Sequence, residues 1–157
     1  MNVYVTSGGR AGVAGLIART LGPDVRLLHD PDGAPMLSGS PLHISISHSR
    51  EFAAIALHPS LRIGIDIEQP RPEQLRRVIA KFLTEKELPL WNDRLLAAWT
   101  CKEAVYKAAG VRNLALGAID LTRPGIATIP DGRRFLLNIT ETPAYTLTTA
   151  IPLDADH

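Results

Sequence analysis

Two carboxylates, Asp66 and Glu68, stand two residues apart in the run Leu61–Glu68, in which every second residue is aliphatic. Successive side chains of a strand point to opposite faces, so both carboxylates share one face and the aliphatic residues share the other. Like charges roughly 7 Å apart along a strand repel, and neither residue type favours a strand, so a compensating cation would explain them. Carboxylate oxygens suit a hard divalent ion such as Mg²⁺, which retains waters and substrate phosphates. The alternative is an amphipathic strand whose acidic face meets only water.

A third carboxylate, Glu103, lies on the apolar stripe of a predicted helix, about 40° from the centre of that stripe at Trp99. A lone buried carboxylate costs several kcal/mol or stays protonated, so Glu103 requires a cation or a cavity. Lys107, four residues further on, could supply the cation, or could simply pair with Glu103 on an exposed helix face. If the strand and the helix meet, Asp66, Glu68 and Glu103 form a three-carboxylate metal site with Lys107 nearby as a phosphate ligand.

The elements that must position these side chains follow from turn residues and hydrophobic periodicity. Strands are predicted at residues 2–6, 25–29, 43–47, 52–57, 61–68, 118–122, 125–129, 134–139 and 145–151. Helices are predicted at residues 11–21, 73–83 and 93–109, with a short helix at the capping box 84–87 and Asn92 or Asp93 as the cap of the longest. The three strands between residues 43 and 68 are close enough in sequence for antiparallel hairpins. The order of elements predicts an α+β fold.

Length and composition predict one compact domain over residues 1–157, with 45% hydrophobic and 21% charged residues. The single cysteine, Cys101, excludes a disulfide framework and a multi-cysteine zinc site. Neither a signal peptide nor a bilayer-spanning apolar stretch is found, so we expect a cytoplasmic protein that does not contact a membrane. A net charge of +1 argues against nucleic-acid binding. Residues 71–113 nevertheless hold nine basic and five acidic side chains, which suit an acidic partner, a phosphate-bearing ligand or an ordinary solvated face.

Four segments of the chain resemble, in order, the motifs of 4′-phosphopantetheinyl transferases of the surfactin-synthetase-activating branch. These segments are ISISHS at 44–49, GIDIE at 64–68, FLTEKEL at 82–88 and WTCKEAVYK at 99–107. Any one of them would be weak evidence, whereas four in this order are specific. The resemblance implies an α+β fold of two related α/β halves with antiparallel sheets, packed as a pseudo-dimer. In this chain the halves would be about 1–60 and 61–157, with the first half trimmed.

Enzymes of this family transfer the phosphopantetheine arm of coenzyme A to a serine hydroxyl of an acyl or peptidyl carrier protein and release adenosine 3′,5′-bisphosphate. The resemblance implies that Asp66, Glu68 and Glu103 hold Mg²⁺ on the coenzyme A pyrophosphate. It also makes Glu103 the base for the serine and Lys107 a ligand of the pyrophosphate. A metal of this kind polarises the attacked phosphorus, and a base within reach makes the hydroxyl a nucleophile.

Ser47 and His48 resemble the family's ligands for the nucleotide end of coenzyme A, near its 3′-phosphate. The family's lysine in the preceding turn is replaced by Ala34, and we expect Arg10 to provide a substitute contact. Carrier proteins of this type are acidic, which suits the basic segment 71–113. Both motif-bearing segments lie on one chain, so a monomer is predicted.

Two other interpretations stay open at this point. A trimmed relative of the family could bind coenzyme A or a carrier protein without turnover, and Ala34 favours this interpretation. A different Mg²⁺-dependent phosphotransferase on an unrelated fold is also conceivable, although no glycine-rich loop ending in Gly-Lys-Ser/Thr is present.

Overall fold

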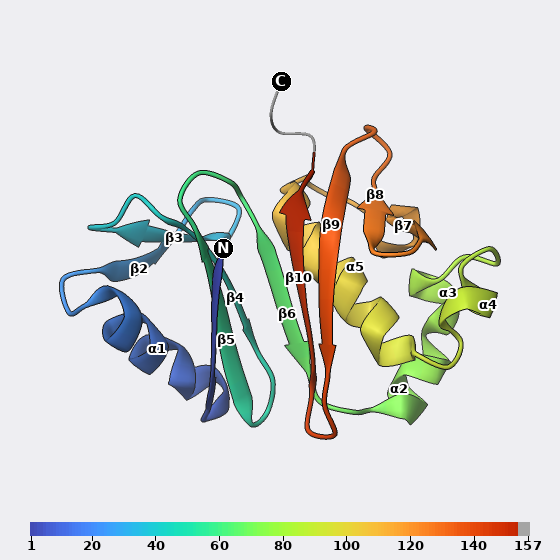
Figure 1. The fold of residues 1–157 in the computed structure, drawn as a ribbon, viewed down its shortest axis with the longest axis horizontal. Helices are drawn as coiled ribbons and strands as arrows, with labels where there is room; N and C mark the ends of the chain where they lie inside the picture. Colours follow the sequence, from blue (N-terminus) through green and yellow to red (C-terminus); the bar gives the residue numbers. More distant parts are fainter. Residues whose placement is uncertain (154–157) are drawn as a thin grey trace.

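The computed structural model describes residues 1–153, which form two units of sheet and helix side by side (Figure 1). The strands are β1 (Asn2–Ser7), β2 (Arg26–His29), β3 (Pro35–Ser38), β4 (His43–His48), β5 (Phe52–His58), β6 (Gly64–Glu68), β7 (Asp120–Arg123), β8 (Ile126–Thr128), β9 (Arg134–Glu141) and β10 (Thr146–Pro152). The helices are α1 (Gly12–Leu21), α2 (Pro72–Arg77), α3 (Ile79–Phe82), α4 (Leu88–Trp91) and α5 (Leu95–Ala109). This mixture of helices and antiparallel sheets confirms the predicted α+β class. The last four residues of the predicted second half, 154–157, lie outside the described residues.

Four layers make up the molecule, with α1 and α5 on the outer sides and two sheets between them (Figure 1). The first sheet has the antiparallel order β1-β5-β4, and the second has the antiparallel order β6-β10-β9-β8-β7. Helix α1 covers one face of β5, and the opposite face of β5 packs against β6. The hairpin β2–β3 stands beside the first sheet, and its second strand, β3, is absent from the prediction.

Helix α5 lies directly on strand β6, because Gly64 leaves room for the helix backbone. A Cβ atom at Gly64 would stand 1.8 Å from the carbonyl oxygen of Ala104, so any other residue would push the helix away. Asp66 and Glu68 share the face of Gly64 by strand alternation and therefore face α5. The opposite face of β6, including Ile65 and Ile67, packs against the first sheet. The strand and the helix thus meet, as the predicted site requires.

The predicted hairpin between β5 and β6 is wrong. Residues 59–63 carry the chain across to the second sheet, where β6 pairs antiparallel with β10. The other edge of β6 meets β4 through serine side chains in place of a backbone ladder. The Ile65 N–H donates to Ser45 Oγ and the Ile67 N–H donates to Ser47 Oγ, both at 3.0 Å. Alternate serines of β4 therefore satisfy the backbone donors of a strand in the other sheet.

The helical boundaries differ from the prediction in three places. The short helix predicted at 84–87 is a turn there, and α4 follows it at Leu88–Trp91. The helix predicted at 73–83 is interrupted at Val78, which separates α2 from α3. The predicted caps Asn92 and Asp93 are wrong, since Arg94 occupies the cap position of α5 and makes no side-chain cap. The same helix ends at Gly110, in the left-handed conformation with φ +61°, as expected. No helix among residues 1–153 is long and apolar enough to span a bilayer.

Candidate active site

Asp66 is buried between the two units, and its two carboxylate oxygens have different surroundings. Oδ1 accepts a hydrogen bond from the hydroxyl of Ser47 at 3.2 Å and lies 3.4 Å from the ammonium of Lys107. Oδ2 is buried and has no hydrogen-bond partner among the described residues. Burial raises the pKa of Asp66 to about 7; the charge of Lys107 opposes this rise, whereas the charges of Glu68 and Glu103 add to it. The interpretation in which Asp66 simply faces water is wrong, because only 5% of the residue is exposed.

Lys107, in the last turn of α5, joins the two units at this point. Its ammonium donates to the carbonyl oxygens of Ile65 at 2.8 Å and Ile46 at 3.1 Å. These acceptors come from β6 and β4, so the lysine lies across the junction between the sheets. Its ion pair within the described part of the chain is with Asp66, and the alternative pairing with Glu103 on an exposed helix face is not formed.

Glu68 and Glu103 lie in the same electrostatic environment as Asp66. Burial raises the pKa of Glu103; Lys107 opposes the rise and the charge of Glu68 adds to it. Glu68 forms an ion pair of 3.4 Å with Arg71, whose guanidinium stands 5.3 Å from the ring centroid of Trp99. The β6 strand and the α5 helix therefore bring the three predicted carboxylates into mutual influence.

The residues at this site fit a hard divalent cation, although no three carboxylate, imidazole or thiol groups within residues 1–153 already converge as a metal cluster. A buried carboxylate oxygen without a partner, Asp66 Oδ2, is an available ligand atom. Burial, opposed by Lys107 and reinforced by the neighbouring acids, raises the pKa of two adjacent carboxyl groups, Asp66 and Glu103, so a bound cation would favour their charged forms. Oxygen-only donors suit Mg²⁺ or a similar ion.

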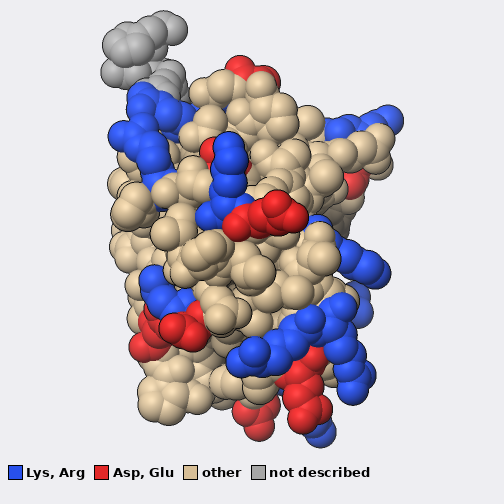
Figure 2. Space-filling model, turned by 90° about the vertical axis from the view of Figure 1, so that its right-hand side faces the viewer, with Lys and Arg blue, Asp and Glu red and all other residues tan. Residues whose placement is uncertain are grey.

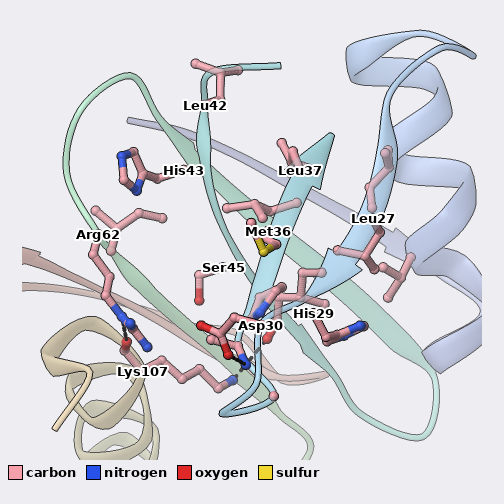
Figure 3. A pocket seen from close by; sticks show the side chains of 18 of the residues that line it. Leu27, His29, Asp30, Met36, Leu37, Leu42, His43, Ser45, Arg62 and Lys107 are labelled. Carbon is pink, nitrogen blue, oxygen red and sulfur yellow. Dashed lines mark hydrogen bonds between the residues drawn. The ribbon is translucent and has the colours of Figure 1, made fainter. Parts of the chain in front are cut away.

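A cavity of about 1160 Å³ opens beside Lys107, between α1, the β2–β3 hairpin, β4 and the end of α5 (Figure 3). Four basic side chains line it, against two acidic ones. The basic residues are Arg10, Arg62, Lys107 and Arg112, and the acidic ones are Asp30 and Asp32. Leu27 and Leu37 provide an apolar wall opposite Arg62 and Lys107 (Figure 3). The cavity is large enough and basic enough to receive a large ligand that carries phosphate groups.

The predicted ligands of coenzyme A differ in where the structure places them. His48 and Arg10 line the cavity, as does Ala34 at the position of the family's lysine. Ser47 is buried and does not line the cavity, because its hydroxyl is occupied between the Ile67 N–H and Asp66. The structure thus shows Ser47 holding a carboxylate of the site. The sequence shows that Ser45 and Ser47 alternate on one face of a buried strand. It does not show that β6 is the strand whose backbone they bind.

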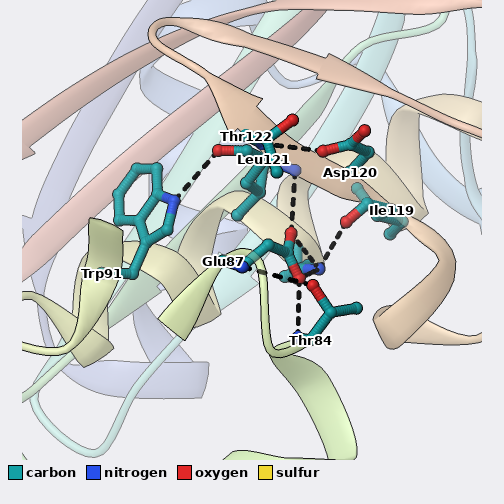
Figure 4. Close-up of polar contacts among 8 residues, drawn as sticks. Thr84, Glu87, Trp91, Ile119, Asp120, Leu121 and Thr122 are labelled. Carbon is teal, nitrogen blue, oxygen red and sulfur yellow. Dashed lines mark hydrogen bonds and ion pairs between the residues drawn. The ribbon is translucent and has the colours of Figure 1, made fainter. Parts of the chain in front are cut away.

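The other lysine of α5, Lys102, is fully buried and pairs with Glu87, whose polar contacts are shown in Figure 4. Its ammonium contacts both carboxylate oxygens of Glu87, at 2.9 and 2.8 Å, and the carbonyl oxygen of Ile119. Glu87 also accepts the backbone N–H groups of Thr84 at 2.9 Å and Leu121 at 2.8 Å. The first of these bonds, with the reciprocal bond from the Glu87 N–H to Thr84 Oγ1 at 3.3 Å, confirms the predicted capping box. Lys102 therefore cannot contribute to the basic surface expected over residues 71–113.

Comparisons with known proteins identify the family of the chain. The family described as the 4′-phosphopantetheinyl transferase superfamily matches residues 62–151. The chain is 32% identical to the 4′-phosphopantetheinyl transferase AcpT of Salmonella typhi over 149 residues, which cover 85% of this chain and 76% of the relative. The AcpT protein of Salmonella typhimurium is 31% identical with the same coverage. The 4′-phosphopantetheinyl transferase HetI of a Nostoc species is 31% identical over 99 residues, 55% of this chain and 42% of the relative.

A cavity with phosphate-binding character, a buried carboxylate–lysine pair at its end and these similarities define one class of enzyme. The chain belongs to the 4′-phosphopantetheinyl transferase superfamily, and its α+β fold is the fold of that superfamily.

Proposed function

We propose that the protein transfers the 4′-phosphopantetheine arm of coenzyme A to a serine hydroxyl of an acyl or peptidyl carrier protein, with Mg²⁺ as cofactor. The observation that carries this proposal is the position of Asp66, a buried carboxylate with one unpartnered oxygen, against Lys107 at the wall of the basic cavity. Such a group is poised for a cation and a phosphate. The relatives named as phosphopantetheinyl transferases support the same reaction.

In this reaction the serine oxygen forms a bond to the attacked phosphorus of the pyrophosphate, and the bond to the leaving adenosine 3′,5′-bisphosphate breaks. Asp66, Glu68 and Glu103 would hold the Mg²⁺ ion. When bound, the ion neutralises charge on the pyrophosphate and polarises the attacked phosphorus. Glu103 takes the proton of the serine hydroxyl. Lys107 stabilises negative charge on the pyrophosphate.

Coenzyme A would lie in the cavity between the two units. His48 and Arg10 are placed in its lining for contact with the nucleotide end of the ligand, near the 3′-phosphate. Ala34 lines the same cavity and offers no charge, so Arg10 is the substitute that we propose for the missing lysine. The apolar wall of Leu27 and Leu37 suits the uncharged part of the molecule.

The carrier protein that we propose as partner is acidic. Arg76, Arg77 and Lys81 are exposed on α2 and α3, near Glu68 and Arg71 in the chain. Several basic side chains gather in the lower half of Figure 2, which looks onto the end of the molecule that holds these helices. Complementary charge would accelerate the encounter and weaken with salt. We further propose a cytoplasmic monomer of the surfactin-synthetase-activating branch.

The test is to incubate the protein with Mg²⁺, coenzyme A and a panel of apo carrier proteins, and to measure the mass of each carrier. A carrier that gains the mass of one phosphopantetheine arm is the expected result. The matched control is Glu103→Gln, which removes charge and basicity with little change in volume; we expect transfer to fall at least about 10³-fold at unchanged thermal stability. Coenzyme A binding without any mass gain on several carriers would instead favour a non-catalytic binding module.

A further inference from the structure

Arg62, in the segment between β5 and β6, lies on the wall of the cavity and is fixed there by one contact. Its Nε donates a hydrogen bond to the carbonyl oxygen of Lys107 at 2.9 Å (Figure 3). That carbonyl belongs to the last turn of α5, where helix carbonyls lack partners within the helix. The side chain is therefore anchored by the nitrogen nearest its aliphatic stem.

Gly110 makes the space that the guanidinium of Arg62 occupies. A Cβ atom at Gly110 would stand 2.7 Å from both Cζ and Nη1 of Arg62. The helix end and the arginine thus fit closely together. Because the arginine is already held in place, little side-chain entropy remains to be lost when it binds a ligand.

The terminal nitrogens of Arg62 are the part of the group that remains available. Among residues 1–153, the Nε bond to Lys107 is the one hydrogen bond that Arg62 makes, so Nη1 and Nη2 have no partner. Arg112, by contrast, is paired with Asp32. A planar guanidinium with two free nitrogens is suited to a phosphate group, which it binds through parallel hydrogen bonds.

A helix-capping role alone does not explain this position. Arg133 donates from Nη2 to the carbonyl oxygen of Ala109 at 3.1 Å, so it also stabilises the C-terminal end of α5. Arg133 does not line the cavity, and it is further engaged with Asp131 and Phe135. The two arginines share the capping contact, and Arg62 alone of the two adds free donors on the cavity wall.

We propose that Arg62 binds a phosphate group of coenzyme A and contributes to the selection of that substrate; this rests on the proposed function. Arg62 contacts the backbone of Lys107, whereas Asp66 contacts the ammonium at the other end of the same side chain. The cavity wall therefore offers two positions for anionic groups, separated by the length of a lysine side chain. Coenzyme A carries two such groups, the pyrophosphate and the 3′-phosphate.

The test compares Arg62→Gln with Arg133→Gln, because both variants lose a capping arginine and one of them also loses a cavity donor. Titration calorimetry with coenzyme A should give a dissociation constant at least about tenfold higher for Arg62→Gln and within about threefold of wild type for Arg133→Gln. In the transfer assay, KM for coenzyme A should rise in proportion while kcat stays within about threefold. Arg62→Lys should restore part of the affinity.

Dephospho-coenzyme A, which lacks the 3′-phosphate, shows which group Arg62 contacts. If the penalty of Arg62→Gln disappears with this ligand, the contact is with the 3′-phosphate; if the penalty persists, the contact is with the pyrophosphate. Equal affinities of the two glutamine variants would overturn the proposal and leave Arg62 as a helix cap. A wild-type protein that binds coenzyme A but transfers nothing would contradict the proposed function alone, whereas one that does not bind coenzyme A would contradict both.

Discussion

Helix α5 carries two lysines, five residues apart, that each pair with a carboxylate from another element, and the two pairs differ in how completely they are satisfied. Lys102 and Glu87 are at most 1% exposed, and both Glu87 oxygens accept hydrogen bonds from the lysine and from backbone N–H groups. Lys107 is 29% exposed at the cavity wall, and its partner Asp66 keeps one buried oxygen without a hydrogen-bond partner in the described part of the chain.

This difference separates a structural pair, Lys102–Glu87, from the Lys107–Asp66 pair that we propose to be part of the active site. In the first pair the charges are neutralised and bonded on every side, so the pair ties α5 to the turn at Thr84 and to the strand at Leu121. In the second pair burial raises the pKa of the Asp66 carboxyl, and Lys107 offsets this rise only in part. An incompletely bonded carboxylate is what we expect of the proposed site, because that site would also bind a cation and an anionic substrate.

The largest effect on the free energy of unfolding is expected at the structural pair, Lys102–Glu87. Lys102→Ala leaves the charge of Glu87 buried without its partner, and we expect the free energy of unfolding to fall by about 3–5 kcal/mol. The double variant Lys102→Met with Glu87→Gln removes both charges and should recover at least half of this loss. Lys107→Ala, at the half-exposed pair, is the matched control and should cost less than half as much. Equal losses in urea unfolding at the two lysines would contradict the distinction.

The raised pKa of Asp66 should make the stability of the protein depend on pH. Its pKa is about 7 in the folded chain against an ordinary value of 3.8, so the folded state binds a proton that the unfolded state releases between these values. The resulting stabilisation is complete below about pH 4 and is lost as the pH rises through 7, by up to about 4 kcal/mol.

Asp66→Asn should remove this dependence and should make the chain more stable than wild type at pH 8 in the presence of a chelator. The exposed Glu73→Gln serves as the control and should keep the wild-type profile. Unfolding curves between pH 4 and pH 8 provide the measurement. Identical profiles for wild type and Asp66→Asn would show that the pKa of this carboxyl is not raised.

A smaller effect is expected at the serines of β4. Ser45→Ala and Ser47→Ala each leave a backbone N–H of β6 without its acceptor, so both should cost about 1–3 kcal/mol of stability. Ser47→Ala also releases Asp66 from its hydroxyl donor, and we expect transfer to fall roughly tenfold further than in Ser45→Ala. Thermal unfolding and the transfer assay measure the two effects separately. Equal transfer rates in the two variants would assign Ser47 a purely structural role.

The sequence predicts most elements of this fold and the face on which the carboxylates lie, because these depend on local periodicity. Gly64, Asp66 and Glu68 alternate with aliphatic residues, and the structure places that face against α5 as strand geometry requires. The partner of β6 was not predictable in this way. Its pairing with β10 joins segments about 80 residues apart, whereas the prediction paired β6 with β5, its neighbour along the chain.

The site was predicted less completely than the fold, because burial is a property of the assembled chain. Lys102 resembles a surface residue in the sequence, and only Ile119 and Leu121, from a later segment, reveal it as part of the core. Ser47 was expected to face a ligand, yet β6 approaches it and takes up its hydroxyl. Arg62 gave no signal, since its anchor at Lys107 lies 45 residues further along the chain.

We propose that β6 and α5 together hold one divalent cation, and Mn²⁺ titration followed by electron paramagnetic resonance tests this directly. We predict one ion bound per chain in the presence of coenzyme A. Affinity should fall roughly tenfold or more in both Asp66→Asn and Glu103→Gln, and should not change in Glu73→Gln. A chain that does not bind one Mn²⁺ ion, or whose Mn²⁺ affinity is unchanged by loss of either carboxylate, would contradict the shared cation site.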